Sequence, residues 1–182
     1  VNNTQANATL INAVVADNKA NNGGGLYAQA GSDLLLLGYE SPGQPCWKTG
    51  SCSILTGNKA KTGGGFGVSS EASVVVYAAH IHGNRADNAV VGAIYGDGEA
   101  EIINDMIYDN GSTSDNTYAD EALFKLLGND IETPVLKLSQ VSVADNHVNG
   151  VVLENKKGSL SLNSSIVFDQ QDIYLESGDQ ST

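Results

Sequence analysis

The chain has 182 residues, a formal net charge of −12 and a hydrophobic content of 41%. This length is enough to bury one core, and this hydrophobic content excludes a disordered chain. With 21 glycines but only 3 prolines, the composition also excludes collagen. The acidic excess repels phosphate, so we expect no nucleic-acid partner, and no apolar run is long enough for this segment to insert into a membrane.

A four-residue motif, apolar-x-Asp/Gly-Asn, recurs along the chain. Its copies lie at residues 15–18, 55–58, 81–84, 107–110 and 143–146, with a weaker copy, ending in Gln, at 167–170. Successive copies end 40, 26, 26, 36 and 24 residues apart. The repeat unit is therefore about 25 residues, with insertions near 38–51 and 111–133.

Each repeat contains the pattern of three short strands. Apolar residues alternate before and within the motif, as at Leu10 and Val15, and a Gly-apolar segment follows after a polar turn, as at 24–27. Three strands per turn of this length predict an all-β fold, a right-handed single-stranded parallel β-helix of about five to six coils. We expect residues 1–182 to form one such domain, a segment of a longer protein.

The Asn that ends each full motif has an architectural role in this prediction. Asn tolerates the left-handed backbone conformation of a sharp corner, and stacked Asn amides can bond to one another. The sequence thus predicts a structural ladder of stacked amides formed by Asn18, Asn58, Asn84, Asn110 and Asn146.

The first insertion contains both cysteines of the chain. Cys46 and Cys52 are six residues apart with no His nearby. This arrangement favours a disulfide that closes a small loop, and it argues against a metal site. A disulfide indicates an oxidising, extracellular compartment. Trp47 lies in the same loop and is a candidate binding residue.

The middle repeats carry an outward-facing stripe of apolar and aromatic residues. His80 and His82 share one face, and the repeat places Met106 and Tyr108 directly beside them. We expect one of the insertions to cover this stripe. The alternative is an open docking surface for a glycan or a protein, with these four residues as its binding residues.

The sequence offers few residues for catalysis or metal binding. Arg85, the only Arg, stands two residues from Asp87, and the default interpretation is a solvated ion pair. Asp97, Glu99 and Glu101 alternate on one face and are the candidates for a Ca²⁺ ion, although a solvated edge is the more common role of such residues. We therefore predict no catalytic residues and no cofactor other than this possible Ca²⁺.

The second insertion contains the segment 120–128, Asp-Glu-Ala-Leu-Phe-Lys-Leu-Leu-Gly. Acidic residues at its start and Gly at its end predict a short amphipathic helix. Leu123 and Leu127 would pack this helix against the flank of the β-helix.

The segments 18–27, Asn-Lys-Ala-Asn-Asn-Gly-Gly-Gly-Leu-Tyr, and 58–66, Asn-Lys-Ala-Lys-Thr-Gly-Gly-Gly-Phe, resemble the repeats of bacterial surface proteins. The resemblance is to the polymorphic outer-membrane protein repeat and, more broadly, to secreted β-helix proteins of the pectin-lyase-like superfamily. It extends over nearly the whole chain and implies a fold more specifically than a function.

We therefore expect a non-catalytic extracellular or cell-surface module that acts as an adhesin, a recognition domain or a stalk. Its partners would be a glycan or protein on another surface, or neighbouring domains of its own longer chain. The alternative is a polysaccharide lyase or hydrolase of the pectin-lyase-like fold, or a fragment of one. Sequence strings typical of polygalacturonases, such as Gly-His-Gly, do not occur here.

Overall fold

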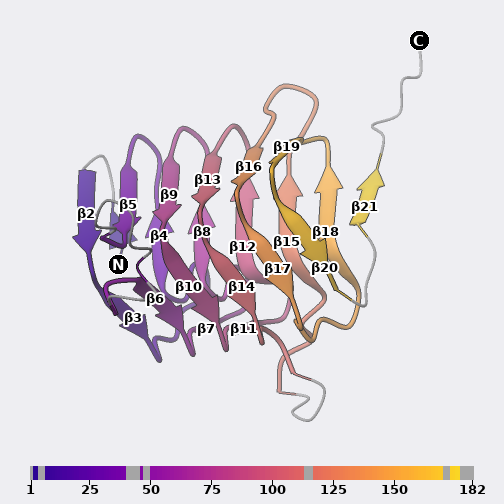
Figure 1. Cartoon of the computed structure of the whole chain (residues 1–182). Helices are drawn as coiled ribbons and strands as arrows, with labels where there is room; N and C mark the ends of the chain where they lie inside the picture. Colours follow the sequence, from indigo (N-terminus) through magenta and orange to yellow (C-terminus); the bar gives the residue numbers. More distant parts are fainter. Residues whose placement is uncertain are drawn as a thin grey trace.

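The computed structural model describes residues 2–3, 7–39, 46, 50–112, 117–169 and 173–176. These residues form a parallel β-helix of about six coils, in which each coil lies beside the next along one axis (Figure 1). The predicted fold class is confirmed, since every named strand pair is parallel and joins neighbouring coils.

Three long sheets run along the axis, and each coil contributes one strand to each. Sheet A consists of β1 (Asn2–Asn3), β4 (Leu26–Ala28), β8 (Phe66–Val68), β12 (Ala89–Tyr95), β15 (Ala122–Leu127), β18 (Val151–Lys156) and β21 (Ile173–Glu176). Sheet B consists of β2 (Asn7–Ile11), β5 (Asp33–Leu37), β9 (Ser73–Tyr77), β13 (Glu99–Ile103), β16 (Val135–Ser139) and β19 (Ser159–Asn163).

Sheet C follows sheet B in every coil and carries the repeated motif. Its strands are β3 (Val14–Ala16), β6 (Ser53–Thr56), β10 (Ala79–His82), β14 (Met106–Tyr108), β17 (Ser142–Ala144) and β20 (Ile166–Phe168). A small two-stranded sheet, β7 (Lys59–Ala60) with β11 (Arg85–Ala86), lies between sheets C and A.

Left-handed residues make the corners at both ends of sheet C. Between sheets B and C they are Asn12, Ala78, Asn104, Gln140 and Ser164, and after sheet C they are Asp17, Gly57, Gly83, Asp109 and Asp145. The expectation that the Asn of each motif is left-handed is therefore wrong. The preceding Asp or Gly turns the corner instead, because these residues tolerate positive φ, and the Asn is left to make hydrogen bonds.

The core fills the interior with alternate residues of the three sheets. In β9, for example, Val74 and Val76 are buried while Ser73, Val75 and Tyr77 are partly exposed. The same alternation in neighbouring coils stacks apolar side chains in rows along the axis. One coil could not bury its inner face alone, so the stacking itself creates the core.

One row of the core contains a glycine between two phenylalanines. Phe66 and Phe124 are both in register with Gly92, and their ring centroids lie 6.4 Å apart across it. A Cβ atom on Gly92 would come within 2.3 Å of the Phe66 ring. The missing side chain is therefore what allows the two rings of alternate coils to meet.

We expect Gly92→Ala to destabilise the domain by about 1–3 kcal/mol, because the added methyl group overpacks this row. The measurement is urea unfolding of the wild type, Gly92→Ala, Phe66→Leu and the double variant. The smaller side chain at position 66 should recover part of the loss. Strictly additive losses would contradict the proposed packing conflict.

The helix predicted over residues 120–128 is wrong, because this segment contains strand β15. Leu123, Phe124 and Leu126 are completely buried, and even Lys125 is only 7% exposed. A strand buried on both faces has no polar alternation, so its apolar run resembles that of a short helix. Parallel pairing with β12 and β18 satisfies its backbone groups.

The predicted disulfide between Cys46 and Cys52 is confirmed, with an S–S distance of 2.04 Å. The loop that it closes lies between β5 and β6, at the corner between sheets B and C. The other coils have one left-handed residue at this corner. Cys46 is buried, and its Sγ lies 3.5 Å from the carbonyl oxygen of Ala78 in the next coil. Trp47 lies outside the described residues.

Candidate functional site

The five Asn residues at the end of sheet C form a continuous line of hydrogen bonds. The Nδ2 group of each donates to Oδ1 of the Asn one coil further on, over 2.9 Å from Asn18 to Asn58 and 3.1 Å from Asn58 to Asn84. The corresponding distances for the next two steps, which end at Asn146, are 3.0 and 2.9 Å. The backbone N–H of each Asn donates to the same oxygen.

An aspartate ends this line. Asn146 donates its Nδ2 group over 2.9 Å and its backbone N–H over 3.2 Å to Oδ2 of Asp169. A side-chain amide in this place would accept these hydrogen bonds and donate another to the next coil. A carboxylate can only accept, so Asp169 terminates the ladder. The ladder serves the architecture, and the candidate site must be sought on the outward residues beside it.

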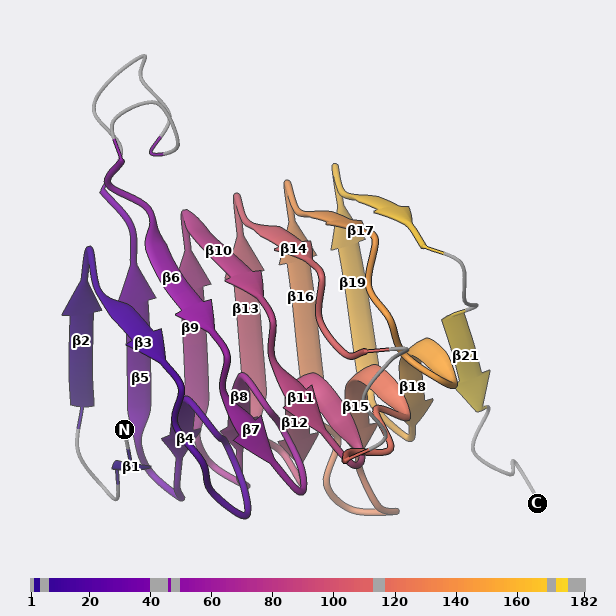
Figure 2. The same ribbon diagram turned by 90° about the horizontal axis from the view of Figure 1, so that it is seen from below.

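The outward stripe on sheet C has the register that the repeat predicts. His80 pairs with Met106 and His82 with Tyr108 on the neighbouring strand, and Figure 2 shows these strands, β10 and β14, on the near side of the molecule. Met106 is 45% exposed and Phe168, further along the same sheet, is 79% exposed. The segment predicted as a covering helix is strand β15 of sheet A, while residues 40–45, 47–49 and 113–116 of the two insertions lie outside the described residues.

Aromatic contacts fix the centre of the stripe. The ring of His82 stacks on that of Tyr108, with centroids 5.0 Å apart and an interplanar angle of 11°. The ring of His80 meets Tyr108 edge-on at 6.1 Å. Nδ1 of His82 also shares a hydrogen bond of 3.2 Å with Oγ1 of Thr56. Tyr108 is thereby held as a preorganised ring standing on the sheet.

Partial burial lowers the pKa of His80 below its ordinary value, and the nearby His82 adds to this effect. Both effects favour the neutral form of His80. Its neutral ring suits contact with an uncharged ligand or with the adjacent aromatic ring better than the binding of an anion.

A trough runs along strand β17, next to the stripe. The outward residues of β17 are small, Ser142 and Ala144, and they pair with bulky residues on both sides. The bulky neighbours are Met106 and Tyr108 on β14, and Ile166 and Phe168 on β20. We call this feature, consisting of these six residues, the trough.

Two hollows lie along the trough, one between its walls and one at the corner after sheet C. One of about 270 Å³ is lined by Met106, Tyr108, Ser142, Ala144 and Asp145, with Ile107. The other, about 240 Å³, is lined by Asp145, Asn146, His147, Phe168 and Asp169. Asp145 lines both, so the trough continues past the corner into a polar end.

The polar end of the trough supplies hydrogen-bonding groups. Nε2 of His147 lies 3.6 Å from a carboxylate oxygen of Asp109, and both side chains are substantially exposed. Asp145 and the Asp169 carboxylate lie at the same end. Carboxylates and an imidazole beside an apolar trough can accept and donate hydrogen bonds to hydroxyl groups.

Met106 and Tyr108 were predicted as binding residues, whereas Ile166 and Phe168, which stand at the same two motif positions and form the opposite wall, were not. The sequence does contain a sign of the trough. At the same two motif positions, the side chains are bulky in one repeat, small in the next and bulky in the third. Aligning the strands on their motifs shows it, although the motifs end at unequal spacings of 36 and 24 residues.

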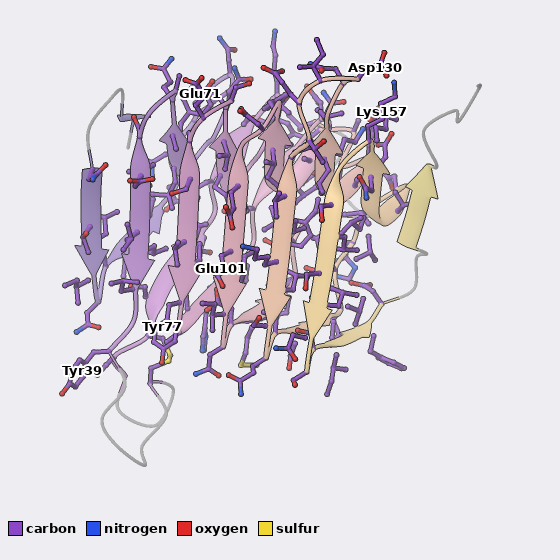
Figure 3. All side chains as sticks on the ribbon, turned by 90° about the horizontal axis from the view of Figure 1, so that it is seen from above. Tyr39, Glu71, Tyr77, Glu101, Asp130 and Lys157 are labelled. Atoms are coloured by element: carbon purple, nitrogen blue, oxygen red, sulfur yellow. A yellow bond between two sulfur atoms is a disulfide. The ribbon has the colours of Figure 1, made fainter. Side chains whose placement is uncertain are left out.

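The calcium candidates do not assemble into a metal site in the described part of the chain. Asp97 accepts a hydrogen bond of 2.7 Å from the backbone N–H of Glu71. Glu99 pairs with Lys137, which is in register with Glu101 on the outer face of sheet B (Figure 3). Among the described residues, no three His, Cys, Asp or Glu side chains meet in a group that could hold a metal ion.

Arg85 has a different partner from the one predicted. Its Nε and Nη2 atoms both lie 2.6 Å from Oδ2 of Asp120, and both side chains are buried. The expectation of a solvated pair with Asp87 is therefore wrong. Asp120 is distant in sequence, and only the return of the chain from the second insertion brings it beside β11.

Within the described residues, no helix is long and apolar enough to span a bilayer. Comparisons of the chain with family models, with curated proteins and with solved structures found no match. The trough therefore has to be interpreted from its own geometry.

Proposed function

We propose that this domain is a non-catalytic recognition module of an extracellular or cell-surface protein, and that it binds an extended, uncharged glycan in the trough of sheet C. The observation that carries the proposal is the bulky-small-bulky profile of three adjacent strands, with Tyr108 on one wall and Phe168 on the other. The inference of a ligand follows from the exposure of these apolar walls.

The dimensions of the trough suit a single extended chain. Its walls are two strand spacings apart, which is ~9.6 Å between backbones. After the thickness of the side chains is subtracted, this width admits one sugar ring but not a folded domain or a helix of ~10 Å diameter. Aromatic rings offer sugars an apolar face, and the polar end beside Asp145 offers hydrogen bonds to hydroxyls.

The charge of the trough favours an uncharged ligand. Asp109, Asp145 and Asp169 lie at its polar end, where His147 is the neighbouring base. An anionic polymer in the trough would be repelled by these local carboxylates.

The extracellular placement is part of the proposal. The Cys46–Cys52 disulfide is the supporting observation, since disulfides persist in oxidising compartments. The Asn-Lys-Ala and Gly-Gly-Gly segments that resemble bacterial surface repeats, including polymorphic outer-membrane and pectin-lyase-like proteins, support it further. A role as adhesin or stalk follows naturally from a rigid stack of coils that carries its binding face along its length.

Screening the 182-residue chain on a glycan array tests this proposal. We expect binding to uncharged glycans, with Tyr108→Ala and Phe168→Ala each weakening the affinity about tenfold because each removes one aromatic wall. Tyr77→Ala is the matched control, since Tyr77 is an outward, partly exposed aromatic residue on sheet B. Calorimetry with the best array glycan supplies the affinities.

Two results would overturn the proposal. The first is the absence of any uncharged glycan whose binding depends on both trough residues. The second is the release of new reducing ends from a bound glycan, because this would show an enzyme and favour the alternative of a polysaccharide lyase or hydrolase. Reducing-end release is measured in the same samples after prolonged incubation.

A further inference from the structure

The basic residues of this acidic protein fall into two groups. Among the described residues, five have a carboxylate partner within salt-bridge distance: Arg85, Lys125, Lys137, Lys156 and Lys157. Three lysines in the same part of the chain have no such partner: Lys19, Lys59 and Lys61. With 21 acidic residues in the sequence, unpaired lysines that gather on one side need a physical explanation.

Two of these lysines stand directly opposite each other. Each follows a ladder Asn, and Lys19 and Lys59 are partners in a parallel bridge. Backbone hydrogen bonds fix this register, since the N–H of Lys59 donates to the carbonyl of Asn18 over 2.8 Å. Like charges on facing positions of adjacent strands, ~4.8 Å apart, destabilise a sheet. A bound anion would relieve this repulsion.

The lysines border a hollow of about 360 Å³, which lies within the size range of small-ligand sites. Its lining residues are Asp17, Asn18, Lys19, Gly57, Lys59, Thr117 and Tyr118. We call it the lysine hollow. It lies beside coils one and two, away from the trough residues on β14, β17 and β20.

One wall of the lysine hollow is held in place by a buried ion pair. The guanidinium of Arg85 lies 5.7 Å from the ring centroid of Tyr118, and Asp120 neutralises the charge of Arg85. The ring of Tyr118 therefore rests on a fixed support and can present its other side to a ligand. Arg85 itself is buried and does not line the hollow.

The charges of the hollow select a ligand with one negative charge. Lys19 and Lys59 contribute two positive charges and Asp17 one negative charge, which leaves a net charge of +1. A phosphate monoester, at about −1.5 to −2, would exceed this balance, whereas a sulfate ester or a carboxylate matches it. The two lysines are flexible point charges and lack the planar fork by which Arg binds a planar carboxylate, so the tetrahedral sulfate fits better.

We propose that the lysine hollow binds a sulfated sugar residue. Lys19 and Lys59 contact the sulfate oxygens, the Tyr118 ring packs against the sugar, and Asp17 accepts a hydrogen bond from a sugar hydroxyl. This site is separate from the trough and does not depend on the function proposed for the trough.

Calorimetry of the full chain with a sulfated tetrasaccharide tests the proposal. We expect Lys19→Gln/Lys59→Gln to weaken binding at least about tenfold, because each lysine makes a charge-assisted contact. Lys61→Gln is the matched control, since Lys61 is also unpaired but does not line the hollow. The slope of log affinity against log salt should fall in the double variant and not in the control. Phe168→Ala, in the trough, should bind the tetrasaccharide as the wild type does.

Comparison ligands decide the chemistry. The desulfated tetrasaccharide and inorganic sulfate should each bind at least about tenfold more weakly than the sulfated sugar, since each lacks half of the contacts. Equal binding of a carboxylated tetrasaccharide would overturn the choice of sulfate, and equal binding of inorganic sulfate would overturn the role of the sugar. Undiminished binding by Lys19→Gln/Lys59→Gln would overturn the site. Far-ultraviolet circular dichroism establishes that each variant is folded.

Discussion

Replacing Arg85 by Met is expected to lower the free energy of unfolding by about 3–5 kcal/mol, because the substitution leaves a buried carboxylate without its cation. The carboxylate of Asp120 is completely buried and receives Nε and Nη2 of Arg85 as well as the backbone N–H of Ala86. The backbone N–H of Asp120 donates in turn to the carbonyl of Ala86 over 2.8 Å. The pair thus fastens the chain to coil three just before β15 begins.

The loss caused by Arg85→Met should depend on pH. Burial raises the pKa of Asp120 above its ordinary value, although the N–H of Ala86 and the Arg85 guanidinium act to lower it. Removing the guanidinium raises this pKa further. Since the folded state then holds the proton more tightly than the unfolded state, the variant loses stability as the pH rises through this raised pKa.

Urea unfolding at about pH 4 and pH 7 measures this dependence, and the deficit of Arg85→Met should be larger at the higher pH. The control is the double variant Arg85→Met/Asp120→Leu, which removes both charges and should recover most of the loss. A double variant as unstable as the single one would show that the guanidinium acts through packing and not through its charge.

Asn84→Ala is expected to cost about 3 kcal/mol of stability, because it interrupts the ladder at a fully buried position. Two donors of Asn58, its Nδ2 group and its backbone N–H, lose their shared acceptor. The carbonyl of Leu55 also loses the Nδ2 group that donates to it over 2.9 Å. Each buried group left without a partner carries its own desolvation cost.

Asn18→Ala is the matched control, because Asn18 is the same residue at the exposed end of the same ladder. Its truncation removes one hydrogen bond to Asn58. No ladder Asn precedes Asn18, so no buried donor loses its acceptor, and we expect a loss of about 1 kcal/mol or less. Thermal and urea unfolding give both values. Equal losses at the two positions would contradict a ladder whose cost depends on burial.

The repeat made most of the fold predictable. Residues with the same role recur at fixed positions relative to each ladder Asn, so the strands, the corners and the stacking order can be read from one chain. The pair Cys46 and Cys52 was equally informative, because its spacing admits few other roles. The position of the left-handed residue was misassigned by one, from Asn to the preceding Asp or Gly, because all three types tolerate positive φ.

The errors lie where long-range contacts decide the structure. Asp120 and Glu121 precede strand β15 and Gly128 follows it, as they would a helix, and only pairing with β12 and β18 makes the segment a strand. Asp87 stands two residues from Arg85 in the sequence, but the carboxylate that contacts Arg85 in the structure is that of Asp120. Local spacing cannot reveal such partners when an insertion of unknown path separates them.

The candidate site was predictable in part. The outward direction of His80, His82, Met106 and Tyr108 follows from strand alternation, and the structure places these four side chains together. The far wall and the lysine hollow depend on the relative bulk and charge of side chains on three or more coils. The repeat gives the register of the stack, but it does not show which outward side chains stay exposed or which loops border them.

The direction of the Asn ladder bears on how such a domain can change in length during evolution. Duplication of residues 59–84 would insert one complete coil that ends in its own Asn, and every amide would still find a donor before it and an acceptor after it. Each added coil would extend the domain by ~4.8 Å without a new core having to be invented. A second Asp169 in the interior would break this continuity, because its carboxylate has no proton to pass onward. The number of coils can therefore vary by internal duplication, while the terminating aspartate has one permitted place.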